Sequence, residues 1–211
     1  MTTKRSLIRR ATAVAAAATA ALLLAACGGN GDNNGSAHNG HNAAAPSSSA
    51  PAQQGDHNAA DVAFAQGMIP HHRQAVEMAA LAATRADSAD VKKLAGEIKK
   101  AQDPEIKTLS GWLTSWGEQI PAEGEGHGGH SGHDMSGMMP AEEMRQLESS
   151  SGKAFDTAFL TMMVKHHEGA VAMAKTEQSD GTYQPAKDMA GAIITSQGAE
   201  IARMNTLLGK S

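Results

Sequence analysis

Residues 61–79 read DVAFAQGMIPHHRQAVEMA, and residues 156–174 read DTAFLTMMVKHHEGAVAMA. The two stretches lie 95 residues apart and are identical at ten of nineteen positions. The same offset, without a gap, aligns the Gln-x-x-Glu-Ile pattern that begins at Gln102 with the one that begins at Gln197. Two matched stretches at one constant offset indicate an internal duplication in which each copy is one supersecondary unit.

Each copy is predicted to form a hairpin of two helices, because apolar residues recur at spacings of three and four along both of its parts. The expected helices cover residues 61–84, 88–116, 155–176 and 185–208. Asp87 or Ser88 is a suitable N-cap for the second helix, Pro185 suits the first turn of the last, and Gly181 supplies the break before it. The sequence therefore predicts an all-α fold, a four-helix bundle that is ferritin-like in its architecture.

Three further features of the helical pattern carry expectations. Residues 140–147 are predicted to form a short extra helix before the second copy. Pro70 and Pro104 lie inside helical patterns and are expected to kink the helices or to force local adjustment.

The N-terminus has the pattern of a bacterial lipoprotein signal. Four cations and no acid precede an apolar run from Ala11 to Ala26, which is too short for a comfortable membrane span. The run ends in LAACG at residues 24–28, which resembles the lipobox, where the cysteine is acylated and becomes the mature N-terminus. We expect residues 1–26 to be removed and Cys27 to anchor the protein, by its lipid, at the outer face of the cytoplasmic membrane. An ordinary secretory signal is the alternative.

The rest of the chain divides by composition. Residues 27–57 are rich in Gly, Asn, Ser, Ala and Pro, which predicts a flexible tether. The duplicated domain is expected at 58–209, with the first repeat at 58–117 and the second at 141–209. The connection at 118–140 is rich in histidine and methionine.

Composition excludes several classes of protein. Cys27 is the single cysteine, so the domain has neither a disulfide nor a thiolate metal site. The formal net charge of −4 becomes −8 without residues 1–26, because that segment carries four of the 18 basic residues and none of the 22 acidic ones. An acidic chain without a basic run is a poor nucleic-acid binder.

Polar residues interrupt the apolar stripes of the second helix in each copy. Gln102 and Glu105 fall within the stripe of the first copy, and Gln197 and Glu200 fall within that of the second. A buried polar group without a partner costs on the order of 1–3 kcal/mol, and a charge costs more. Partners for these side chains are therefore predicted inside the bundle.

The first helix of each copy supplies such partners. In the first copy, one face of this helix carries Asp61, Met68 and His72, and an adjoining strip carries Phe64, His71 and Met78. In the second copy, the equivalent face carries Asp156, Met163 and His167, and the adjoining strip carries Phe159, His166 and Met173. Adjacent histidines point about 100° apart, so one pair need not ligate a single ion. One imidazole of each pair is expected to face the core and the other a seam or the other hairpin, with the assignment left open.

Imidazole, thioether and carboxylate groups thus converge twice, which favours a metal site. Imidazole with thioether suits copper, especially Cu(I), although another divalent metal stays open. The Gln-x-x-Glu pattern disfavours a di-iron site, which needs Glu-x-x-His. The alternative is a metal-free polar network that sets the helix register. The connection offers weaker ligands, or is a solvated linker: His127, His130, His133, Met135, Met138 and Met139.

At these motifs the sequence resembles family 305 of the domains of unknown function, bacterial proteins with a ferritin-like helical fold. The resemblance covers residues 58–209 and includes MIPHH at 68–72, FDTAFLTMMVKHHEGA at 155–170 and both Gln-x-x-Glu-Ile patterns. Some members are implicated in periplasmic copper binding and copper tolerance, which implies a similar role for the Met and His residues above. The copies differ where Arg73 stands opposite Glu168, a departure that implies unequal sites.

The sequence therefore predicts a non-enzymatic, membrane-anchored, extracytoplasmic protein that buffers or transfers a metal ion, copper foremost. Two alternatives stay open: a metal-dependent oxidoreductase on a ferritin-like bundle, and a metal-free helical adaptor. No nucleotide motif or nucleophile–base arrangement occurs, and no protein partner is indicated.

Overall fold

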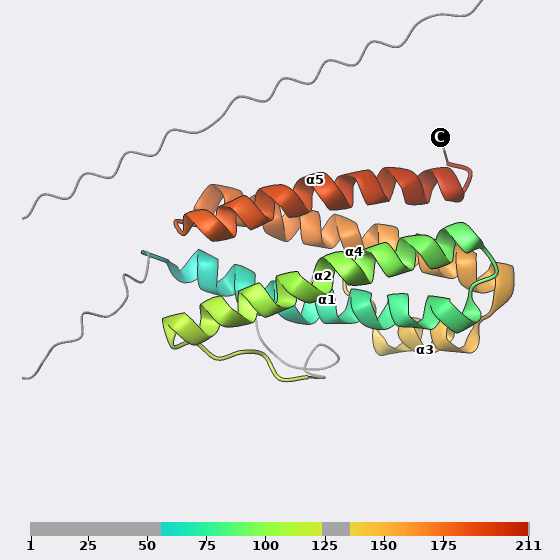
Figure 1. The fold of residues 1–211 in the computed structure, drawn as a ribbon, viewed down its shortest axis with the longest axis horizontal. Helices are drawn as coiled ribbons and strands as arrows, with labels where there is room; N and C mark the ends of the chain where they lie inside the picture. The colour runs from blue at the N-terminus through green and yellow to red at the C-terminus, as the bar shows by residue number, and fades with distance from the viewer. Residues whose placement is uncertain (1–55, 124–135, 211) are drawn as a thin grey trace, which may run out of the picture. The chain divides into compact units, whose positions relative to one another are not determined.

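The computed structural model of the chain describes residues 56–123 and 136–210. They form five helices: α1 at Ala59–Arg85, α2 at Ala89–Trp116, α3 at Ala141–Ser149, α4 at Gly152–Asp180 and α5 at Gln184–Leu207 (Figure 1). The predicted all-α bundle of four long helices with a short extra one is confirmed. Cys27, the signal segment and all but the last residues of the tether lie outside the described residues.

The helix ends follow from their capping residues. Asn58 caps α1, with its side chain accepting from the amides of Ala60 and Asp61. Ser88 caps α2, as predicted, and accepts from the amide of Val91. Gly117 ends α2 at φ 76°, a left-handed conformation that glycine adopts without a steric penalty.

Both internal prolines lie within unbroken helices. The hydrogen bonding of α1 runs past Pro70 and that of α2 past Pro104, so neither residue ends its helix. Proline lacks the amide hydrogen that the preceding turn would accept. Tertiary packing therefore holds each helix together across one missing bond.

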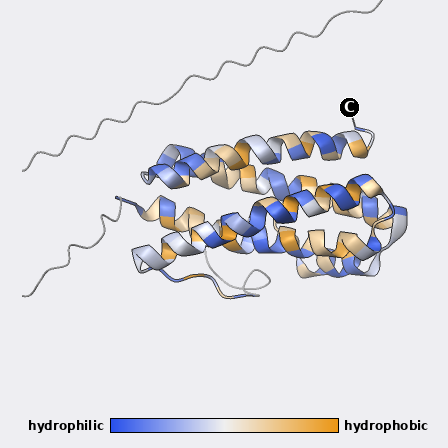
Figure 2. Ribbon diagram, in the orientation of Figure 1, coloured by the Kyte–Doolittle hydropathy of each residue, from blue (hydrophilic) through white to orange (hydrophobic). Residues whose placement is uncertain are grey.

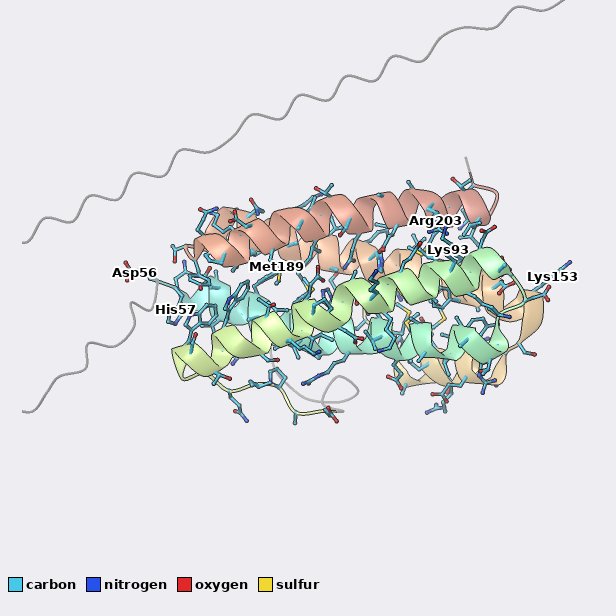
Figure 3. All side chains as sticks on the ribbon, in the orientation of Figure 1. Asp56, His57, Lys93, Lys153, Met189 and Arg203 are labelled. Atoms are coloured by element: carbon cyan, nitrogen blue, oxygen red, sulfur yellow. The ribbon has the colours of Figure 1, made fainter. Side chains whose placement is uncertain are left out.

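The bundle consists of two hairpins. α1 packs chiefly on α2, α4 packs chiefly on α5, and the hairpins meet through α1 and α4. An ion pair between Arg203 and Glu97, with Nη1 and Oε2 2.5 Å apart, links α5 to α2. Figure 3 shows the Arg203 side chain in the space between these two helices.

The core is made of two apolar clusters. The first gathers around Met78, Leu94 and Phe155, and the second around Phe64 and Leu109. Along α1 the second cluster precedes residues 71–72 and the first follows them; along α4 the order around residues 166–167 is reversed. Helices α1 and α4 therefore run antiparallel, with the histidine pairs in a layer between the clusters.

Polar residues cover the outside of this core. Figure 2 shows hydrophilic and hydrophobic segments alternating along each long helix, as expected for helices with one buried face. Short α3 buries Met144 and Leu147 against the first cluster. None of the described helices combines the length and apolarity that crossing a bilayer requires.

Candidate metal centre

The first histidine of each pair faces the other hairpin. His71 of α1 and His166 of α4 stack with their ring centroids 3.8 Å apart and their planes at 44°. Their residues are 1% and 0% exposed. The antiparallel arrangement of α1 and α4 brings them together, because equivalent positions meet where such helices cross.

The second histidine of each pair faces its own hairpin. Nε2 of His72 lies 2.7 Å from Oε2 of Glu105, and Nε2 of His167 lies 2.7 Å from Oε2 of Glu200. A carboxylate only accepts, so Nε2–H is the donor in both pairs. The prediction that the two imidazoles of a pair face different ways is confirmed, and all four are buried.

The layer contains seven buried polar atoms without a hydrogen-bond partner. They are Nδ1 of His71, His72 and His167, both ring nitrogens of His166, and Oε1 of Gln102 and Gln197. Native proteins leave few buried polar groups unpaired, and each such group calls for an explanation such as a bound ion or water. The lone pairs of this layer are therefore available to a cation.

Burial keeps the central histidines neutral. Burial, with a smaller contribution from the nearby His72, lowers the pKa of His71 to about 3, against the opposing effect of the hydrogen bond to the Ser136 carbonyl. Burial also lowers the pKa of His166 well below its usual value, with the neighbouring histidines acting in the same direction. A metal binds the neutral imidazole, so these side chains need not lose a proton near neutral pH.

The methionines divide into two groups. Met68 and Met163 are fully buried and precede the histidine pairs by three and four residues, which places them on the same helix face. Met78 and Met173 lie seven residues beyond His71 and His166, about 10 Å along the helix, and all four methionines pack in the apolar clusters on either side of the layer. The first group is therefore one helical turn from the histidine pairs and the second about two turns away.

The available donors are imidazole nitrogen, thioether sulfur and amide oxygen. Among the described residues, no group of three or more His, Cys, Asp or Glu side chains stands ready to hold a metal ion. The further donors are the thioethers of Met68 and Met163, one helical turn before the histidine pairs, and the unpartnered amide oxygens of Gln102 and Gln197. This mixture fits a soft ion better than one that prefers carboxylates.

The structure does not bring the predicted ligands Asp61 and Asp156 to the histidine layer. Each lies ten residues before its histidine, about 15 Å along the helix. Asp61 accepts from the backbone amides of Thr182 and Tyr183, at 3.2 and 2.9 Å to its Oδ1. Asp156 accepts from the amides of Asp87 and Ser88, at 3.1 and 2.9 Å. Each aspartate thus fastens the turn of the opposite hairpin.

The connection is described only at its ends. His127, His130, His133 and Met135 lie outside the described residues. Met139 is 2% exposed and belongs to the first apolar cluster, so it does not lie in an exposed part of the connection; Met138 is half-buried. Arg73 donates from Nη1 to the carbonyl of Pro121 at 2.7 Å, which holds the other end of the connection on α1.

The sequence interpretation did not identify two buried polar residues. Gln74 is 2% exposed and Glu177 is 1% exposed. At the offset of 95, Gln74 is equivalent to Gly169 and Glu177 is equivalent to Ala82. A polar residue in one copy where the other copy has a small one was the sequence signal that could have identified both residues. Burial, together with the neighbouring Asp61 carboxylate, raises the pKa of Glu177 to about 8.

The fold and the site define a class: duplicated all-helical bundles with a buried layer of histidine, glutamine and glutamate at mid-height. The chain belongs to the family described as Domain of unknown function (DUF305), whose profile matches residues 61–208. The comparison with curated proteins gives no match.

Solved structures of this family are similar to the chain. A secreted-protein candidate from Streptomyces coelicolor is 33% identical, with a TM-score of 0.65, over 72% of this chain and 91% of that one. A fragment from Deinococcus radiodurans is 27% identical, with a TM-score of 0.64, over 73% and 98%. CopM in its Cu(I)-bound form is 30% identical, with a TM-score of 0.58, over 70% and 94%. CopM has also been solved with Cu(II) and with silver.

Proposed function

We propose that this protein binds copper in the buried histidine layer and serves as an extracytoplasmic, membrane-anchored buffer or carrier of the metal. The observation that carries the proposal is the set of unpartnered lone pairs on His71, His72, His166 and His167. Three of these imidazoles have Nε2 bound to an oxygen acceptor, which leaves Nδ1 as the free lone pair. A histidine that donates one N–H to an acceptor and offers the other nitrogen has the usual arrangement of a metal ligand.

Copper is favoured over zinc by the neighbouring groups. The buried thioethers of Met68 and Met163 lie one helical turn before the histidine pairs, and thioether sulfur selects Cu(I) among the common metals. The copper-bound and silver-bound forms of CopM, a similar protein of the same fold, support this choice.

The N-terminal segment supports a location outside the cytoplasm. Its cations, short apolar run and Cys27 match a lipoprotein signal, and a relative from Streptomyces coelicolor is described as a secreted-protein candidate. We propose binding and transfer rather than catalysis because the four imidazoles are at most 1% exposed. A substrate would have to open the bundle to reach a metal held there.

A thermal-shift panel tests the proposal. The full chain is melted with Cu(I) under anaerobic conditions, and with Cu(II), Zn(II), Fe(II), Mn(II) and Ca(II). A ligand of the folded state adds about 2.7 kcal/mol of stability at 100 times its Kd, so copper raises Tm. The double variant His71→Ala, His166→Ala loses this rise, whereas the control His57→Ala, outside the layer, keeps it.

Other outcomes would contradict the proposal. An unchanged Tm with every metal supports the metal-free adaptor. A rise that survives in the double variant places the metal elsewhere in the chain.

A further inference from the structure

A segment of the connection lies directly on the central histidine pair. We call residues 136–139 the strap. The strap precedes α3 and runs past α1 and α4. Nε2 of His71 lies 3.2 Å from the carbonyl oxygen of Ser136. A carbonyl only accepts, so this contact requires the proton of His71 on Nε2 and the lone pair on Nδ1.

Gln74 holds the far end of the strap. Its Oε1 accepts from the amide of Met139 at 2.7 Å, and its Nε2 donates to the carbonyl of Met139 at 2.9 Å. Gln74 and Met139 are each 2% exposed, so both bonds are shielded from water. One side chain therefore satisfies both main-chain groups of a buried residue, and the pair is costly to break.

Gly169 makes room for the near end. A Cβ atom at this position would overlap the carbonyl group of Ser136. Gly137 is equally constrained: it has φ 83°, and a Cβ there would lie 2.7 Å from the carbonyl oxygen of Lys165 and 2.9 Å from Cα of Gly169. The strap thus contacts the backbone of α4 itself, at a point where neither side has a side chain.

The two residues that receive the strap are equivalents in the duplication. Gln74 and Gly169 lie 95 residues apart, three positions beyond His71 and His166 respectively. A single strap cannot obey the two-fold relation of the helices. The copies accordingly differ at this position. In the first copy the Gln74 amide hydrogen-bonds the strap, and in the second copy Gly169 has no side chain and leaves space for it.

We infer that Gln74 and Gly169 are positioning residues, which hold the Ser136 carbonyl on His71 and so make the two halves of the metal centre unequal. The inference rests on the proposed function for the presence of a metal, whereas the contacts between the strap and the histidine do not depend on that function. His71 is preset as the Nε2–H tautomer with Nδ1 free, whereas both ring nitrogens of His166 lack a partner. Of the stacked pair, His71 is then the imidazole organised before the metal arrives.

Histidine NMR of the metal-free chain tests the geometry. In the full chain labelled with ¹⁵N-histidine, His71 gives the nitrogen shifts of a single Nε2–H tautomer. Gly169→Ala displaces Ser136 and moves these shifts toward a mixture of tautomers. The matched control is Gly198→Ala, because Gly198 is an exposed helical glycine with nothing within 4 Å of its Cβ position. Helix content from circular dichroism shows that both variants fold.

A second pair of variants tests whether the change in the His71 shifts arises from the strap and not only from the substitution at Gly169. Gln74→Ala releases Met139 and changes the His71 tautomer in the same direction, whereas Gln146→Ala, an exposed amide on α3, does not. Unchanged His71 shifts in both Gly169→Ala and Gln74→Ala would overturn the inference.

Metal affinity supplies an independent measurement. Loss of a group that orients a ligand weakens binding by about 10-fold or more, so both strap variants lose Cu(I) affinity against a competing chelator while the two controls keep it. If the tautomer changes but affinity does not, the inferred link to the metal is wrong. If the wild-type chain binds no copper, the proposed function fails, and the tautomer measurement still decides the role of the strap.

Discussion

His71 and His166 stack across the α1–α4 interface with ring centroids 3.8 Å apart, and the 95 residues between them are the offset of the whole duplication. Under a two-fold relation, a residue near the axis meets its own equivalent. The duplicated motif therefore builds one shared centre rather than two separate ones. His72 and His167, turned toward Glu105 and Glu200, flank this centre on either side.

The carboxylates behind the outer histidines are expected to tune metal affinity. Glu105→Gln retains an oxygen that accepts from His72 but removes the negative charge behind the ring. Such changes behind a ligand typically cost 10–100-fold in affinity, and we expect a loss of about this size for Cu(I). Competition with a chromophoric Cu(I) chelator measures it. Glu77→Gln, at an exposed position of α1, is the control, and equal affinities of the two variants would refute the role of Glu105.

Asp156 is expected to act on stability and not on metal binding. Asp156→Ala leaves the amides of Asp87 and Ser88 without their acceptor, which costs about 1–3 kcal/mol of unfolding free energy. Urea denaturation measures this loss, and the exposed Asp188→Ala stays within about 0.5 kcal/mol of wild type. Copper affinity is unchanged, because about 15 Å of helix separates Asp156 from His166. A loss of affinity without a loss of stability would restore Asp156 as a ligand.

Glu177 is expected to make the fold sensitive to alkali. Its pKa is about 8 in the folded state, against an ordinary 4.5, so between these values the folded chain holds a proton that the unfolded chain has released. The stabilisation is complete below about pH 4.5 and is lost as the pH rises through about 8. The slope is at most about 1.4 kcal/mol per pH unit.

Replacement by an amide removes this dependence. Glu177→Gln carries no titrating proton, so wild type loses stability relative to the variant between about pH 5 and about pH 9 in urea denaturation. Glu77→Gln, on the exposed face of α1, runs parallel to wild type. A constant difference between wild type and Glu177→Gln over this range would show that Glu177 is ionised throughout.

The fold was predictable because local apolar spacing and the internal duplication specify it. The apolar spacing located all five helices, with ends within four residues of those observed, and Ser88 was recognised as a cap from its residue type. The duplication showed that two hairpins of one kind pack together. Helix periodicity likewise identified the inward faces that carry His71, His72, Gln102 and Glu105, since 3.6 residues per turn determine which side chains share a face.

The sequence interpretation grouped the two aspartates with the histidines by helix face alone, without their position along the helix axis. Asp61 shares a face with His72, which suggested a common site, but it lies about 15 Å away along α1. Periodicity specifies angle and says nothing about which end of a neighbouring element reaches a side chain. The turn at Thr182 does so in the folded chain, and its amides occupy the Asp61 carboxylate.

The amino-acid sequence by itself determined the helices, the duplication and the four histidines of the centre, because these depend on residue type and on spacing within a few turns. Only the tertiary structure decided that His71 meets His166, that each aspartate fastens the opposite turn, and that Gln74 and Gly169 receive one strap. The hydrogen bonds and the ring stacking among these contacts join residues 65 to 122 positions apart. Their partners are chosen by how two hairpins and a connection pack, which no local pattern encodes.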